Sequence, residues 1–190
     1  MDDGSRLSGL IIVVLFFFAA YFAVAETAFA SVSKIKIKAG VERGDARAEK
    51  ALHILDNFDK AVTTVLIGTN IVHLTIASMV TVIVTRRWGI SAVTVGTIVT
   101  TIAVFFLGEM LPKSIAKRYS ERLALATAGS LCFFMRIFTP ISYVLTKIGQ
   151  AAAKLSGPGE EVSVTEDELY DIIEDMTDGG ALNEDQGALI

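Results

Sequence analysis

Three long stretches of the chain carry no Asp, Glu, Lys or Arg, and they limit what it can fold into. They are residues 10–25, 61–85 and 88–108. A helix needs about 20 mostly apolar residues to cross a bilayer, so we predict membrane helices over about 7–30, 61–85 and 89–111. Hydrophobic residues make up 52% of the chain, which fits this class. The sequence therefore predicts an all-α, polytopic membrane protein with three spans.

The first apolar stretch also has some features of a cleaved signal peptide. Residues 23–25 read Ala-Val-Ala, which has the small-x-small form of a cleavage site. However, Asp2 and Asp3 precede the stretch with Arg6, and the basic cluster lies after it, at 34–38. A signal peptide places its basic residues first, so we favour a membrane helix.

Basic residues are distributed unevenly around the predicted spans. Residues 34–60 hold seven Lys and Arg, and residues 113–154 hold another seven. The other three are Arg6, Arg86 and Arg87. Lys and Arg collect on the cytoplasmic side, so we predict a plasma-membrane protein with its N-terminus outside and its C-terminus in the cytoplasm.

The segment 121–154 can be read in two ways. Arg136 and Pro140 interrupt it, and the uncharged runs on either side of Arg136 are too short to span separately. We predict a pair of interfacial helices along the cytoplasmic leaflet. A tilted fourth span with a snorkelling Arg136 stays open as the alternative. In either case residues 1–155 form the transmembrane domain.

An acidic tail follows a short Gly-Pro linker. Residues 160–190 contain eleven Asp and Glu and no Lys or Arg. Thr165 and Glu168 have the spacing of a capping box, and apolar residues then recur at helical spacing. We predict an acidic helical bundle that packs on the membrane domain or on a second subunit. Its pattern is cut off at Ile190, so we expect the natural protein to continue further.

A carboxylate and a proline stand at the inner end of the third apolar stretch. Glu109 sits where a charged side chain costs at least about 2.5–3.5 kcal/mol, so it needs a partner or a function. Pro112 removes the backbone hydrogen bond that the Gly108 carbonyl would accept. A free carbonyl beside a carboxylate offers hard oxygen ligands to a cation. The alternative is a salt bridge between Glu109 and Lys113, one turn further along.

Polar residues on the other predicted helices could face the same interior. Asn70 is either a neutral oxygen ligand or an interhelical hydrogen-bonding group. His73 fits the second role better, because no other residue pairs with it at His/Cys metal spacing. Glu26 is either a ligand or half of an ion pair near the interface. Small and hydroxyl residues fit close helix packing; they include Ala19, Ala23, Thr81, Thr97 and Thr101.

The candidate ligands limit the possible chemistry. Oxygen ligands without Cys or paired His select hard cations, namely Mg²⁺, Ca²⁺, Na⁺ or Mn²⁺. The sequence has no Ser-His-Asp arrangement, glycine-rich phosphate loop or HExxH motif, so we do not expect an enzyme. We also expect no nucleic-acid partner.

Three motifs resemble the transmembrane domain of the CorC/cyclin M family of magnesium transporters. They are Ala-Glu-Thr-Ala at 25–28, Ile-Gly-Thr-Asn-Ile-Val at 67–72 and Gly-Glu-Met-Leu-Pro-Lys at 108–113. The tail resembles the acidic helical bundle that follows this domain. The resemblance implies a homodimer with three membrane helices per subunit and juxtamembrane helices on the inner face. It also implies nucleotide-binding CBS domains, which this chain lacks.

The resemblance further implies Mg²⁺ export, coupled to Na⁺ entry. By analogy, Glu109 and Asn70 would contact the ion; the Gly108 carbonyl that Pro112 leaves free is our own candidate beside them. Glu26 and Thr27 would lie near it, and Thr69 is a further candidate ligand. Gating or structural roles would belong to Gly68, His73, Pro112 and Lys113. Ala19 and Ala23 stand where the family often has serines.

Two other functions remain open from the sequence. The chain could be a sensor or scaffold that binds Mg²⁺ and regulates another transporter without carrying flux itself. It could also be a structural anchor for the missing cytoplasmic domains. A bound cation should stabilise a transporter or a sensor by mass action, and a structural anchor should show no such effect.

Overall fold

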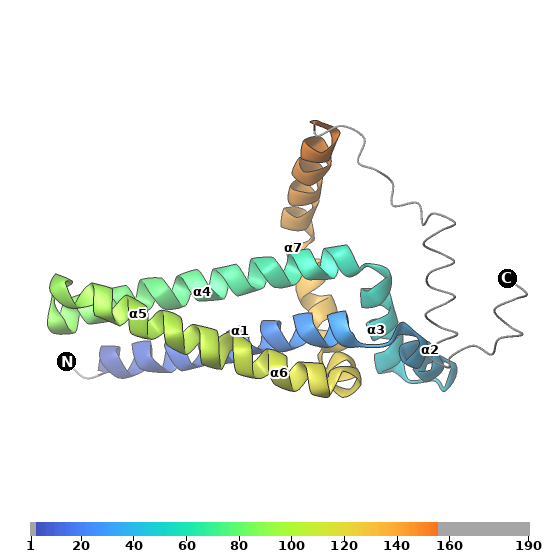
Figure 1. The fold of residues 1–190 in the computed structure, drawn as a ribbon, viewed down its shortest axis with the longest axis horizontal. Helices are drawn as coiled ribbons and strands as arrows, with labels where there is room; N and C mark the ends of the chain where they lie inside the picture. Colours follow the sequence, from blue (N-terminus) through green and yellow to red (C-terminus); the bar gives the residue numbers. More distant parts are fainter. Residues whose placement is uncertain (1–2, 156–190) are drawn as a thin grey trace, which may run out of the picture. The chain divides into compact units, whose positions relative to one another are not determined.

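The computed structural model describes the backbone of residues 3–155, which is helical throughout apart from short turns (Figure 1). The predicted acidic bundle at 160–190 lies outside the described residues. Residues up to Val144 belong to one compact unit, and a second unit begins at Leu145. The helices are α1 (Asp3–Ser31), α2 (Lys34–Glu42), α3 (Ala46–Asp56), α4 (Phe58–Trp88), η1 (Ile90–Ala92), α5 (Val93–Ala103), η2 (Val104–Met110), α6 (Leu111–Arg118) and α7 (Ser120–Leu155).

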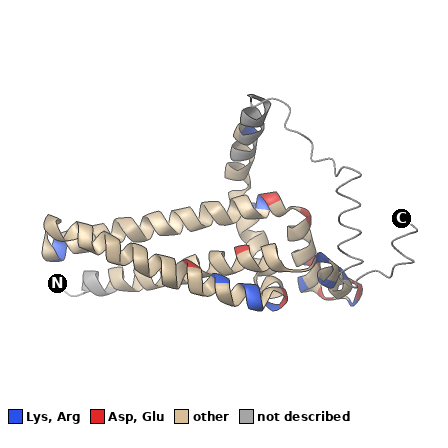
Figure 2. Cartoon of the chain, in the orientation of Figure 1, with Lys and Arg blue, Asp and Glu red and all other residues tan. Residues whose placement is uncertain are grey.

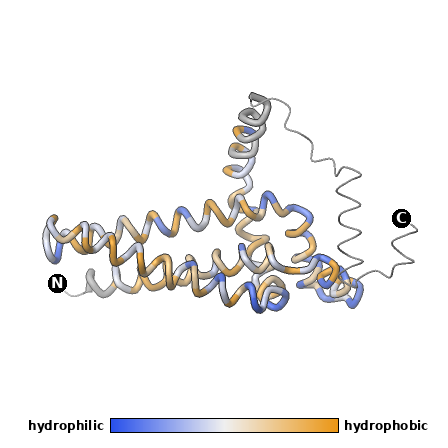
Figure 3. Tube along the Cα trace, in the orientation of Figure 1, coloured by the Kyte–Doolittle hydropathy of each residue, from blue (hydrophilic) through white to orange (hydrophobic). Residues whose placement is uncertain are grey.

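Three long helical stretches run side by side in the first unit (Figure 1). They are α1, α4 and the third helical stretch, which is η1, α5, η2 and α6 together (Ile90–Arg118). Figure 2 shows most of their charged residues near their ends, and Figure 3 shows that their middle parts are largely hydrophobic. By length and composition each could cross a membrane. They overlap the three predicted spans, and most of their ends extend somewhat beyond the predicted bounds.

Helix α7 differs from the prediction. It continues through Pro140 as one helix, so the predicted pair of shorter helices is wrong, and Ser120–Val144 is a fourth stretch long and apolar enough to span. Up to Val144 it crosses the other three stretches instead of running along them (Figure 1). Tyr21 on α1 donates a hydrogen bond to Ser130 Oγ at 2.7 Å, and the Phe22 and Phe134 rings lie 5.2 Å apart. These contacts attach α7 to α1.

Helices α2 and α3 form a compact pair after α1, and neither was predicted from the sequence. Gly44 has a φ of 79°, which lets the chain reverse between them. Asp45 caps α3 by accepting a hydrogen bond from the Arg47 N–H at 2.9 Å. Lys34 Nζ lies 2.7 Å from Asp56 Oδ1, and this hydrogen bond lowers the pKa of the Asp56 carboxyl. The basic region 34–60 is therefore folded and not an open loop.

Gly68 marks a close approach between α1 and α4. A Cβ added to Gly68 would lie against the Phe22 ring, 2.6 Å from Cε1. Phe22 is only 2% exposed and packs against Tyr21 and Phe134, so its ring has little room to move. The absence of a side chain at Gly68 is thus what lets these two helices pack here.

We expect Gly68→Ala to lower the free energy of unfolding by about 1 kcal/mol. Overpacking a tight contact costs about 1–3 kcal/mol, and the higher helix propensity of alanine offsets about 1 kcal/mol of this. Thermal or denaturant unfolding in detergent would measure the change. Gly9→Ala is the matched control, because nothing lies within 4 Å of a Cβ at Gly9 in α1. Equal stability of the two variants would contradict the packing role.

Candidate cation site in the membrane bundle

The third helical stretch contains a π-helical segment, η2, directly before Pro112. The Leu111 N–H donates to the Phe106 carbonyl, five residues earlier. A proline ring crowds the carbonyl four residues before it, which here belongs to Gly108. A wider turn relieves that crowding, and π segments of this kind often occur at functional sites. This segment was not predicted, although Pro112 at the end of an apolar helix was its signal.

Lys113 pairs with Glu26 and not with Glu109. Its Nζ lies 3.0 Å from Glu26 Oε2, so it connects α6 to α1. The suggested salt bridge between Lys113 and Glu109 is therefore wrong. It assumed regular α-helical spacing, whereas the extra residue in the π turn rotates Glu109 away from the face that carries Lys113.

Glu109 faces α4, where it meets His73. The two side chains are 33% and 24% exposed, and His73 Nδ1 lies 3.6 Å from Glu109 Oε1. His73 Nε2 and Thr69 Oγ1, one turn apart on α4, are buried and have no hydrogen-bond partner within the described residues. Buried polar atoms without partners cost about 1–3 kcal/mol each, so water or a ligand that satisfied them would be stabilised here.

A groove of about 420 Å³ lies between α4 and the third helical stretch, with Glu109 in its wall. Its walls mix polar and apolar side chains. Those from α4 are Asn70, His73, Leu74, Ala77, Val80 and Thr81, and those from α5 and η2 are Thr97, Thr100, Thr101, Val104, Phe105 and Glu109.

The polar groups of the groove present mainly oxygen acceptors. Three threonine hydroxyls each donate to the carbonyl four residues earlier, at 2.7–2.9 Å; they are those of Thr81, Thr100 and Thr101. Asn70 Nδ2 likewise donates to the Leu66 carbonyl at 2.9 Å. Each of these threonine hydroxyls has its one donor in use, and Asn70 uses one of its two amide hydrogens, so the hydroxyl oxygens and Asn70 Oδ1 can offer lone pairs to a ligand. Together with the Glu109 carboxylate they form a lining suited to a cation.

The other predicted ligands lie elsewhere in the bundle. Gly108 is buried, and a Cβ there would lie 3.3 Å from that of Ala19 on α1. Glu26 is held by Lys113, and neither it nor Thr27 lines the groove. Thr69 has its hydroxyl buried. Within the part of the chain that the structure describes, no three His, Cys, Asp or Glu side chains form a metal-binding group. The groove thus supplies one carboxylate and neutral oxygens.

Some groove residues were assigned another role or missed. Thr81, Thr97 and Thr101, interpreted above as helix-packing residues that could face the interior, line the groove between the helices. Thr100 and Phe105 were not singled out at all. The available signal for Thr100 was the density of threonines in the middle of the third apolar stretch, which is unusual for residues that only contact lipid.

Comparisons with known proteins agree with this architecture. A family model described as the cyclin M transmembrane N-terminal domain matches residues 10–186. A chloroplastic DUF21 domain-containing protein of Arabidopsis thaliana is 29% identical over 189 residues, which cover 97% of this chain and 28% of that protein. The UPF0053 inner membrane protein YfjD of Escherichia coli is 26% identical over 159 residues, covering 82% and 37%.

A third relative carries a substrate in its name. The polyamine export protein of Haemophilus influenzae is 25% identical over 196 residues, which cover 95% of this chain and 45% of that protein. The chain spans less than half the length of each of these three relatives.

Proposed function

The chain belongs to the cyclin M transmembrane-domain family, and we propose that it carries Mg²⁺ across the membrane through the groove beside Glu109. Membership of this family, with a relative named as an exporter, points to membrane transport and away from enzymatic chemistry. The observation that carries the proposal is the Glu109 carboxylate in a membrane groove whose other polar groups present oxygen acceptors.

Mg²⁺ would bind with part of its water shell. Glu109, the Asn70 oxygen and the threonine hydroxyls supply some oxygen ligands, and retained waters complete the octahedron that this ion requires. The Gly108 carbonyl, whose α-helical hydrogen bond Pro112 removes, is a further candidate oxygen ligand. Alternate opening of the groove toward the two sides would complete a transport cycle, with Na⁺ entry as the driving force for export.

We further propose a homodimer with three spans per subunit in the plasma membrane, the N-terminus outside and α7 lying along the inner surface. The crossing direction of α7 up to Val144 supports an interfacial position (Figure 1). A green fluorescent reporter fused after Ile190 should then fluoresce, because it folds only in the cytoplasm. A dark but expressed fusion would contradict this topology.

The first experiment is Mg²⁺ flux in liposomes that hold the purified chain and an entrapped fluorescent indicator. We expect Mg²⁺-dependent signal above that of empty liposomes, and a larger signal when a Na⁺ gradient is imposed. The melting temperature should also rise with Mg²⁺ concentration by mass action. Stabilisation without flux would instead support a Mg²⁺ sensor or scaffold, and neither effect would support a structural anchor.

A second candidate cargo is a linear polyamine. One relative is named as a polyamine exporter. The groove volume of about 420 Å³ is also larger than a single metal ion requires. Leu74, Val80 and Phe105 give it apolar walls that could contact an alkyl chain, while Glu109 could hold an ammonium group. Radiolabelled spermidine uptake in the same liposomes separates the two: transport that excess Mg²⁺ does not inhibit would favour the polyamine.

A further inference from the structure

A second pocket lies at the corner where α2, α3, α6 and α7 meet, away from the groove. It measures about 470 Å³ and is strongly basic. Its lining consists of Lys36, Arg47, Arg118, Tyr119, Ser120, Glu121, Arg122 and Leu125. We propose that this pocket, named here the basic corner, binds the phosphate headgroup of an anionic phospholipid.

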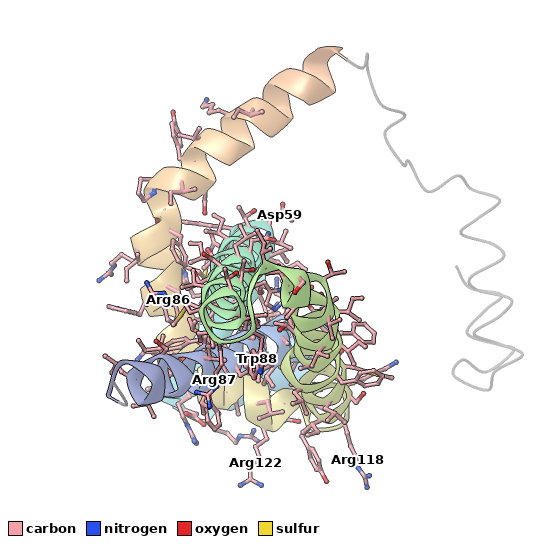
Figure 4. The ribbon with its side chains drawn as sticks, turned by 90° about the vertical axis from the view of Figure 1, so that its left-hand side faces the viewer. Asp59, Arg86, Arg87, Trp88, Arg118 and Arg122 are labelled. Carbon is pink, nitrogen blue, oxygen red and sulfur yellow. The ribbon has the colours of Figure 1, made fainter. Side chains whose placement is uncertain are left out.

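The positive charge of the basic corner is only partly neutralised. Lys36 lies 3.8 Å from Glu121, and Arg47 is held by Asp45 at 3.2 Å. Within the described residues, Arg118 and Arg122 make no ion pair. Figure 4 shows both side chains projecting from the same side of the molecule, away from the helices. Two arginines are thus available for the paired hydrogen bonds that guanidinium groups make to phosphate.

A helix N-terminus adds to this positive field. The long helix α7 begins at Ser120, within the basic corner. The first N–H groups of a helix have no partner in the helix itself, and their aligned dipoles favour a negative group. The N-terminus of α7 and the two arginines therefore act on the same volume.

The basic corner lies at the depth of lipid headgroups. The third helical stretch has 29 residues and ends at Arg118. At about 1.5 Å per residue it is roughly 42 Å long, close to the 40–45 Å thickness of a bilayer with its headgroup regions. Arg118 therefore reaches the polar boundary of the membrane when this stretch spans it.

An apolar stripe leads from the basic corner toward the middle of the membrane. Leu111 and Ile115 lie one turn apart on α6 and Tyr119 directly follows this helix; their side chains are 52%, 55% and 52% exposed. An acyl chain could lie along this stripe while its phosphate enters the basic corner. A soluble phosphate has no acyl chain to contact this stripe, so we assign the basic corner to a lipid.

The test uses the whole chain in neutral detergent micelles, to which phosphatidylglycerol or phosphatidylcholine is added at equal mole fraction. We expect phosphatidylglycerol to raise the melting temperature and phosphatidylcholine to leave it unchanged. The double variant Arg118→Gln/Arg122→Gln should need roughly 25-fold more phosphatidylglycerol for the same rise, at about fivefold per arginine near an anionic surface.

Arg86→Gln/Arg87→Gln is the matched control, because these arginines lie in the last turn of α4, and that end of α4 is at the opposite end of the bundle from α6 (Figure 1). It should keep the phosphatidylglycerol response. Equal loss in both double variants would show a general charge effect and overturn the proposal. A response to soluble glycerol phosphate that matches the lipid response would assign the corner to a soluble anion. Arg118→Gln/Arg122→Gln could also lower the melting temperature in neutral micelles by as much as it does with phosphatidylglycerol. The two arginines would then stabilise the chain through another segment, such as the acidic residues 160–190, and the proposal would be overturned.

Discussion

Replacing Glu109 with glutamine is expected to lower Mg²⁺ flux in liposomes at least about 100-fold, which corresponds to roughly 2.7 kcal/mol of lost cation stabilisation. Glutamine keeps the size of the side chain and a carbonyl oxygen, but it removes the negative charge in the groove wall. In a low-dielectric site that charge is the main attraction for a divalent ion. The rise of melting temperature with Mg²⁺ should disappear in the same variant.

Glu26→Gln is the control for this experiment. Glu26 is a second carboxylate in the same bundle, 34% exposed against 33% for Glu109, but it is paired with Lys113 at 3.0 Å and does not line the groove. Its loss should lower stability modestly and leave most of the flux. Both variants should elute as the wild type does on size exclusion. Full flux in Glu109→Gln, or an equal loss of flux in both variants, would show that Glu109 has no specific role in transport.

The three main helical stretches could be predicted because their sequences allow little else. Uncharged runs as long as 61–85 and 88–108 have no other stable environment than a bilayer or a large core. Helix α7 could not be read in this way. Pro140 lacks a backbone donor and was expected to separate two helices, but a helix can continue past a proline when its other hydrogen bonds are kept.

The candidate site was predictable in part for a related reason. Glu109 and Asn70 stand out because polar side chains are costly in an apolar stretch, and both line the groove. The partners of the charged residues were not predictable, because they depend on helix rotation. A regular helix places Lys113 one turn after Glu109 on the same face. In the structure, which has a π turn here, Glu109 lies beside His73 and Lys113 pairs with Glu26. Pro112 signals a disturbed turn, but sequence spacing does not show how that turn rotates the residues on either side of it.

The π turn itself is the basis of a second prediction, for Pro112→Ala. Alanine restores a backbone N–H at position 112, which can donate to the Gly108 carbonyl and remove the crowding by the proline ring. The turn before it would then tighten to regular α-helix. Glu109 would rotate away from His73, from which it is now 3.6 Å distant, and toward the face that carries Lys113.

We expect Pro112→Ala to lower Mg²⁺ flux at least about tenfold while the melting temperature stays equal or rises, since alanine is the better helix former. Pro140→Ala in α7 is the matched control, because it makes the same substitution at a residue that does not line the groove. It should keep full flux with equal or higher stability. Loss of flux without loss of stability, confined to Pro112→Ala, would mean that the π turn positions the carboxylate for transport. Full flux in Pro112→Ala would show that Glu109 reaches the ion without this turn.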